Sequence, residues 1–240
     1  MRNWHLAVTL VCLLAVCLWL QFSWDFSKLI NFNSFAITAL GVGLALLIAG
    51  FSISDTQKTL AEIRKIEKID DRIHTLLYIN EVVKKHGLPA CEKLAKSHKD
   101  NLLQKGLRML ADNLALELDL AETLNAEIES IKLRHKRLLN ILQFGASVSP
   151  GVGLIGTLVG LTLSGHENAL NHAILTTLYG ALLSNFFFLP LHELIKNRIE
   201  ELNVLNNLTV AGLIKIREGV HSIVLKEHLS GFAKYCQESV

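Results

Sequence analysis

The chain has 240 residues, of which half are hydrophobic and 19% are charged, and its mean hydropathy is +0.35. That balance is too apolar for an ordinary soluble domain. The formal net charge is only +2 and the sequence has no dense basic patch, which argues against nucleic acid as a partner. The composition therefore predicts an integral membrane protein.

Four stretches predict membrane-spanning helices, because a helix needs about 20 mostly apolar residues to cross a bilayer. They cover residues 4–22, 35–53, 146–163 and 172–191. The first stretch has the hydrophobicity of a signal peptide, but it starts with little positive charge and has no cleavage site of small residues, so we expect a retained helix. All of the 24 basic residues except Lys28 then fall on one side, which the positive-inside rule assigns to the cytoplasm together with both termini.

The segments between and after these spans also predict helices. We expect an all-α protein of four parts, namely two spans in residues 1–53, a helical cytoplasmic insert in 54–145, two spans in 146–191 and a helical cytoplasmic tail in 192–240.

Within the insert, apolar residues recur every three or four positions from Leu60 to Leu77, which predicts a helix that Gly87 and Pro89 end. Apolar runs over residues 91–110 and 116–138 predict further helices, and the last of these continues into the third span. The fourth span is expected to continue past Pro190 as a long helix that includes Val220.

The last two spans hold the densest patterns of small residues. Residues 151–156 form a G-x-G-x-x-G motif, but no strand is predicted before it, so we do not expect a nucleotide site. Gly156 with Gly160, and Gly180 with Ser184, instead have the four-residue spacing that lets two membrane helices approach closely.

Two prolines flank these patterns. Pro150 is expected to open the third span, where a missing N–H costs least. Pro190 lies near the inner end of the fourth span, where it can kink the helix.

Thr157, Thr162, Thr176 and Thr177 place hydroxyl groups at lipid depth. A threonine in such a helix commonly bonds to its own backbone carbonyl one turn back. For Thr157 and Thr177, which lie beside glycines on two neighbouring helices, we weigh that interpretation equally with a role in lining a pore. Asn185 is costly in lipid unless it finds a partner.

The four predicted spans contain no Asp, Glu, Lys or Arg. A proton or sodium path across a membrane usually needs an ionisable group at depth. If the chain conducts ions, the carboxylate must therefore come from another subunit. The four cysteines have no metal-binding spacing and no disulfide framework, and neither a metal nor a cofactor is expected.

The run PGVGLIGTLVG, from Pro150 to Gly160, resembles the third transmembrane helix of MotA, the A subunit of flagellar stator units. The run LTTLYGALLSN, from Leu175 to Asn185, together with the Pro190 that follows, resembles the fourth helix. Four spans with a large insert between the second and third are also MotA-like, whereas the related TolQ and ExbB proteins have three spans. The chain is therefore similar to the MotA branch of the MotA/TolQ/ExbB proton channel family.

The resemblance implies a multi-pass subunit of the bacterial inner membrane that conducts protons or sodium ions and couples their flow to mechanical work. It also implies a ring of five A subunits around two B subunits, each B subunit having one membrane helix whose aspartate carries the ion. A rotor protein and membrane lipid are the further expected partners. The alternatives are a TolQ/ExbB-like or other non-flagellar envelope motor, a non-conducting membrane scaffold and, last, an enzyme, for which the sequence offers no nucleophile–base pair or metal cluster.

The same resemblance sorts the candidate site residues into three groups. The ion path would contain Thr157, Thr176 and Thr177, and a rotor or another partner would contact Lys84 and Glu92. Helix packing and gating would involve Pro150, Gly153, Gly156, Gly160, Tyr179, Gly180, Asn185 and Pro190.

Overall fold

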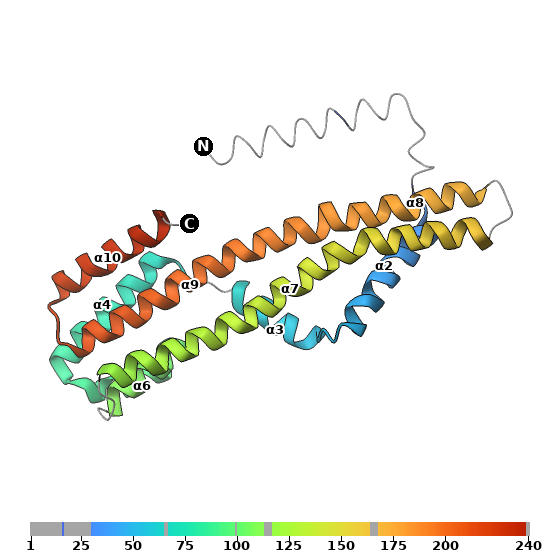
Figure 1. Ribbon diagram of the computed structural model, residues 1–240. Helices are drawn as coiled ribbons and strands as arrows, with labels where there is room; N and C mark the ends of the chain where they lie inside the picture. The colour runs from blue at the N-terminus through green and yellow to red at the C-terminus, as the bar shows by residue number, and fades with distance from the viewer. Residues whose placement is uncertain are drawn as a thin grey trace. The chain divides into compact units, whose positions relative to one another are not determined.

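The computed structural model describes residues 16, 30–64, 67–98, 100–112, 117–163 and 168–238, and none of them lies in a β-strand (Figure 1). The predicted all-α class is therefore confirmed for this part of the chain. The predicted span at residues 4–22 lies outside the described residues, apart from Val16.

The contacts between residues divide the chain into two compact units. The first unit comprises Met1–Gly50 and Phe144–Phe188, and the second comprises Phe51–Gln143 and Leu189–Val240. The division into membrane and cytoplasmic parts stays a prediction.

The first unit is built from α2 (Phe32–Ile48), the C-terminal part of α7 (Glu117–Leu163), α8 (Asn168–Leu182) and the π-helical turn η3 (Leu183–Phe188). Asn31 caps α2, because its side chain accepts a hydrogen bond of 3.2 Å from the backbone N–H of Ser34. The buried face of α2 consists of Ser34, Thr38 and Val42, and α2 packs against α8.

Within the described residues, two helical segments are long and apolar enough to cross a membrane, and they include all but one end residue of each of the predicted third and fourth spans. They run over Asp119–Thr162 and Ala173–Arg217, whereas the apolar helix Phe32–Ile48 has only 17 residues. The count of four spans stays a prediction.

The sequence-based expectation for Pro150 was wrong. Pro150 lies inside α7, a continuous helix of 47 residues, and not at the start of a helix. A proline inside a helix cannot donate a hydrogen bond to the carbonyl four residues earlier, which here is the carbonyl of Ala146. The hydroxyl of Ser184, on η3, donates to that carbonyl at 2.7 Å. The replacement bond explains how α7 continues through the proline.

The second unit contains α3 (Ile53–Arg64), α4 (Ile69–His86), the 3₁₀ turn η2 (Leu88–Ala90), α5 (Cys91–Ser97) and α6 (Asn101–Asp112). The N-terminal part of α7, α9 (Leu189–Arg217) and α10 (Ser222–Glu238) complete it. Gly87, at φ 77°, ends α4 as predicted. Two expectations were wrong: the single helix predicted from Leu60 to Leu77 is two helices, and the tail helix ends at Arg217.

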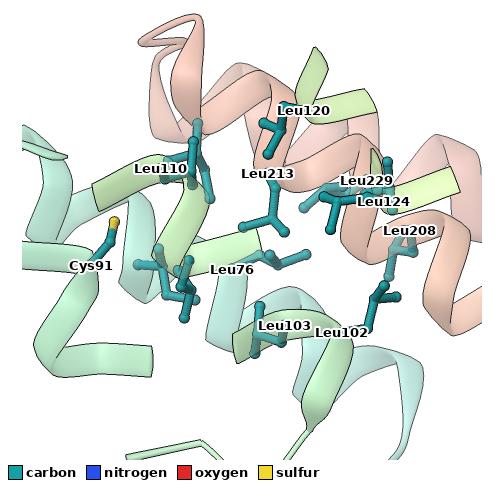
Figure 2. Packing of buried hydrophobic residues seen from close by; sticks show 14 of the residues in the cluster. Leu76, Cys91, Leu102, Leu103, Leu110, Leu120, Leu124, Leu208, Leu213 and Leu229 are labelled. Atoms are coloured by element: carbon teal, nitrogen blue, oxygen red, sulfur yellow. The ribbon is translucent and has the colours of Figure 1, made fainter. Parts of the chain in front are cut away.

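The core of the second unit is a cluster of aliphatic side chains from α4, α6, α7, α9 and α10 (Figure 2). Leu76, Leu103, Leu124 and Leu213 are all buried within it. Cys91 lies in the same cluster, and burial raises the pKa of its thiol to about 11. The Cys91 thiol is therefore a packing group and not a reactive thiolate.

The second unit also holds an ionic cluster, in which a buried arginine meets two partly exposed carboxylates. The guanidinium of Arg72, on α4, lies 2.9 Å from a carboxylate oxygen of Glu67 and 2.5 Å from one of Asp100, and its side chain is 3% exposed. It also donates to the hydroxyl of Thr209, on α9, at 3.2 Å. The other oxygen of Asp100 accepts from the backbone N–H of Leu102 at 2.9 Å, at the start of α6. Arg72 therefore ties three helices of the unit together.

We expect Arg72→Met to lower the free energy of unfolding by about 3 kcal/mol, because it leaves the Asp100 carboxylate without its buried partner. The measurement is denaturant unfolding of the detergent-solubilised protein. Arg198→Met is the matched control: Arg198 pairs with Glu201 on the surface and is 57% exposed, so it should cost no more than about 1 kcal/mol. Equal losses in both variants would contradict a special role for Arg72.

Candidate ion-path site

The centre of the first unit is a close approach of the α7 and α8 backbones at two glycines. A Cβ atom on Gly153 would lie 2.7 Å from the Thr176 carbonyl oxygen, and one on Gly180 would lie 2.6 Å from the Ser149 carbonyl oxygen. Both obstacles are backbone atoms, so neither position admits a side chain without separating the helices. Gly156 and Gly160 face the same helix less tightly, because a Cβ at Gly160 would meet Ala173 at an ordinary 3.4 Å.

Hydroxyl groups bridge the two helices along this contact. Thr157 donates to the Ala173 carbonyl at 2.6 Å, and Ser184 donates to the Ala146 carbonyl at 2.7 Å. Between them, Thr177 lies 3.5 Å from the Gly153 carbonyl. Backbones held close by glycine bring these short side chains within reach of the opposite helix.

The predicted ion-path threonines meet at one point of this contact. The Thr157 hydroxyl lies 3.2 Å from that of Thr176 and is hydrogen-bonded to that of Thr177. Thr176 is buried, Thr157 is half-buried and Thr177 is exposed, so the cluster reaches the surface of the unit at Thr177. Thr162 takes no part, because its hydroxyl bonds to the carbonyls of Leu158 and Val159 on its own helix.

The cluster holds more oxygen lone pairs than protons. Each hydroxyl has one proton to donate, and the Ala173 carbonyl lies within reach of Thr157 and Thr176, at 2.6 and 2.7 Å, while the Gly153 carbonyl lies 3.1 Å from the Thr157 hydroxyl. Thr177 can donate to Thr157 or to the Gly153 carbonyl. In either arrangement the lone pairs of the exposed Thr177 oxygen remain available. The outward-facing atom of the cluster is therefore an acceptor, which suits a cation or an ordered water.

Helix α2 supports α8 from another side, through Ser34 and Thr38, which the sequence analysis missed, and through Tyr179, which it named. The Thr38 hydroxyl donates to the Ser34 carbonyl at 2.9 Å and lies 3.4 Å from the Thr176 carbonyl. The hydroxyl of Tyr179 accepts from the backbone N–H of Asn31 at 2.9 Å, and its ring packs edge-on against Phe35. The four-residue spacing of Ser34 and Thr38 on an otherwise apolar helix is the signal that could have identified them.

The π turn η3, which follows the C-terminal end of α8, holds Asn185 and Phe188, and Pro190 is the second residue of α9. The Asn185 side-chain amide donates to the Ala181 carbonyl, one turn back, at 2.9 Å, and the residue is exposed. Phe188 covers Gly145, where a Cβ would lie 2.5 Å from its ring. These residues do not join the threonine cluster.

Lys84 and Glu92 lie in the second unit, near η2. Lys84 is in the last turn of α4, Glu92 is in the first turn of α5, and both are exposed. Glu92 pairs with Lys96 at 2.9 Å, and this hydrogen bond and charge hold the pKa of the Glu92 carboxyl below its usual value. Across the described part of the chain, no group of three His, Cys, Asp or Glu side chains could hold a metal ion.

Known proteins are similar to this chain in sequence and in fold. The model of the MotA/TolQ/ExbB proton channel family matches residues 94–206. The protein YtxD of Bacillus subtilis is 29% identical over 221 residues, which cover 87% of this chain and 80% of YtxD. Motility protein A of Cereibacter sphaeroides is 28% identical over 182 residues, or 72% of this chain and 71% of that protein.

Among solved structures, C. jejuni MotAB has the same fold, with a TM-score of 0.77 at 18% identity, over 95% of this chain and 92% of the matched chain. On these matches, the chain is similar to MotA-like proteins of the MotA/TolQ/ExbB proton channel family.

Proposed function

We propose that this chain is the A-type subunit of a flagellar stator, which conducts protons or sodium ions through the membrane and turns their flow into force on a rotor. The observation that carries the proposal is the hydroxyl cluster of Thr157, Thr176 and Thr177, built across two apolar helices and open to the surface at Thr177. In a passive membrane anchor, acceptor oxygens that face outward from an apolar helix would be costly in lipid and would serve no purpose. The similarity to motility proteins supports a flagellar machine.

The proposed path is incomplete within one chain. Residues 138–163 and 169–191 contain no Asp, Glu, Lys or Arg, so hydroxyl, amide and backbone oxygens are what they offer an ion. A bare ion at bilayer depth is prohibitively costly without a counter-charge. We therefore assign the ion-carrying carboxylate to a MotB-type subunit with one membrane helix bearing an aspartate, in a complex of five A and two B subunits. The similarity to a chain of a MotAB structure supports such a partner.

The partner surface on the cytoplasmic side would be the corner formed by α4, η2 and α5. Lys84 and Glu92 are exposed on its two sides, and the Glu92 carboxyl is held ionised by Lys96. We assign both charges to contact with the rotor. This assignment places the second unit in the cytoplasm and the first unit in the inner membrane, with both termini cytoplasmic.

We expect the chain alone to carry no flux in lipid vesicles, and its complex with the MotB-type subunit of the same cell to carry flux of one ion. Sodium uptake and a pH-sensitive dye distinguish the two ions. Thr177→Val keeps the side-chain shape and removes the exposed oxygen, so it should lower the flux about tenfold, the effect of losing about 1.4 kcal/mol of ion stabilisation.

Thr162→Val is the matched control for this experiment, because the Thr162 hydroxyl bonds only to its own helix in the described structure, and it should leave the flux unchanged. Robust flux from the chain alone would refute the two-subunit path. An unchanged Thr177→Val complex would refute the threonine assignment.

For the rotor surface, we expect Lys84→Glu and Glu92→Lys each to reduce swimming speed while ion flux and complex formation stay normal, because the charges lie outside the first unit. Swimming is followed by microscopy, and flux is measured in vesicles. The control is Glu227→Lys, an exposed charge on α10, which should leave swimming unchanged. Normal swimming in both charge-reversed variants would refute the rotor assignment and identify these residues as ordinary solvated surface charges.

A further inference from the structure

Helix α8 does not pass directly into α9. Six residues, Leu183–Phe188, form the π-helical turn η3, and Pro190 follows two residues later. Turns of this kind are rare and are frequently found at functional sites. Pro190 cannot donate to the carbonyl four residues earlier, that of Phe186, so the α-helical bonding pattern is already broken at this point.

The π turn changes the direction in which Asn185 points. In an α-helix each residue turns the chain by about 100°, so a residue eight positions after Thr177 would lie about 80° around the helix from it. A turn closed by bonds to the fifth residue holds more residues, so each one turns the chain by less. By this geometry, the angle between Thr177 and Asn185 around the helix axis is smaller than about 80°. Along the axis Asn185 lies about 12 Å from Thr177.

The burial pattern places Asn185 off the face that packs against α7. Thr177 and Asn185 are exposed, whereas Ser184 and Phe188 are buried against α7. Asn185 is therefore not one of the residues that hold α7 and α8 together, and the neighbouring Ser184 makes that contact instead.

The hydrogen bonds of Asn185 leave its oxygen open. A side-chain amide offers two donors and one oxygen with two lone pairs. The amide nitrogen donates to the Ala181 carbonyl at 2.9 Å, which fixes the nitrogen against its own helix. Within the described residues the Oδ1 atom has no hydrogen-bond partner. Such an oxygen in a segment without charged residues is costly unless it is matched by a ligand.

We propose that Asn185 Oδ1 is a second ligand of the ion path, on the inner side of the Thr157–Thr177 pair. The Oδ1 atom coordinates the hydrated proton or the sodium ion after the ion leaves the hydroxyl groups of Thr157 and Thr177. This inference rests on the proposed function and extends it, because conduction through a site requires further oxygens that take over the ion as it moves on. The ligand class is a monovalent cation with its water.

The test uses the complex of this chain with the MotB-type subunit of the same cell, reconstituted in vesicles. Asn185→Leu keeps a side chain of similar size but removes the oxygen, and it should lower the flux per assembled complex about tenfold. Asn185→Gln keeps an amide oxygen and should retain most of the flux. The matched control is Phe186→Leu, an exposed neighbour in the same turn, which should leave the flux unchanged.

Complex formation is measured by co-purification for each variant, so that a packing defect is recognised. Unchanged flux in Asn185→Leu, with a normal response to Thr177→Val, would overturn this inference and leave the proposed function intact. Loss of assembly in both Asn185→Leu and Asn185→Gln would also overturn it, because Asn185 would then be a packing residue. Absence of flux in the unsubstituted complex would overturn both.

Discussion

The close approach of α7 and α8 at Gly153 and Gly180 is the constraint on which the first unit depends. Because neither glycine leaves room for a Cβ, the backbone carbonyls of one helix come within reach of short hydroxyl side chains on the other. The same approach brings Thr157, Thr176 and Thr177 into one cluster. A side chain at Gly153 would therefore remove more than packing, since it would separate the oxygens that form the site.

The two prolines show how the helices accommodate a broken backbone bond in two ways. Pro150 leaves the Ala146 carbonyl without its N–H, and Ser184 supplies a hydroxyl in its place, so α7 continues. Pro190 likewise leaves the Phe186 carbonyl without a backbone N–H donor, and at that point the chain adopts the π turn. The first solution gives a rigid contact between helices. The second is accompanied by an exposed polar side chain, that of Asn185.

Some features that depend on local sequence were predictable, although the break between α3 and α4 and the end of α9 were missed. Features that depend on contacts between helices were not predictable. Gly87 ended α4 as expected, because a helix end is set by local backbone conformation. The position of Pro150 inside a helix was missed, because the hydroxyl that replaces its bond comes from Ser184, 34 residues away along the chain. Ser34 and Thr38 were overlooked for the same reason, since their importance lies in the contact with α8. The threonine cluster could be expected in outline because glycine spacing and hydroxyl positions coincide in the sequence.

The proposed ion path has no charged side chain in this chain, and in the proposed stator this prevents an isolated subunit from conducting ions. A carboxylate placed at the Thr157 level of this chain would bind cations before any partner arrived, and a membrane with isolated subunits would be exposed to leakage. A few hydroxyl and amide oxygens replace only part of a cation's hydration shell, and they bring no counter-charge. In the proposed complex the charge comes from the B-type subunit, and conduction therefore begins only when the two kinds of subunit have assembled. Dividing the site between two chains makes assembly itself the condition for ion flow.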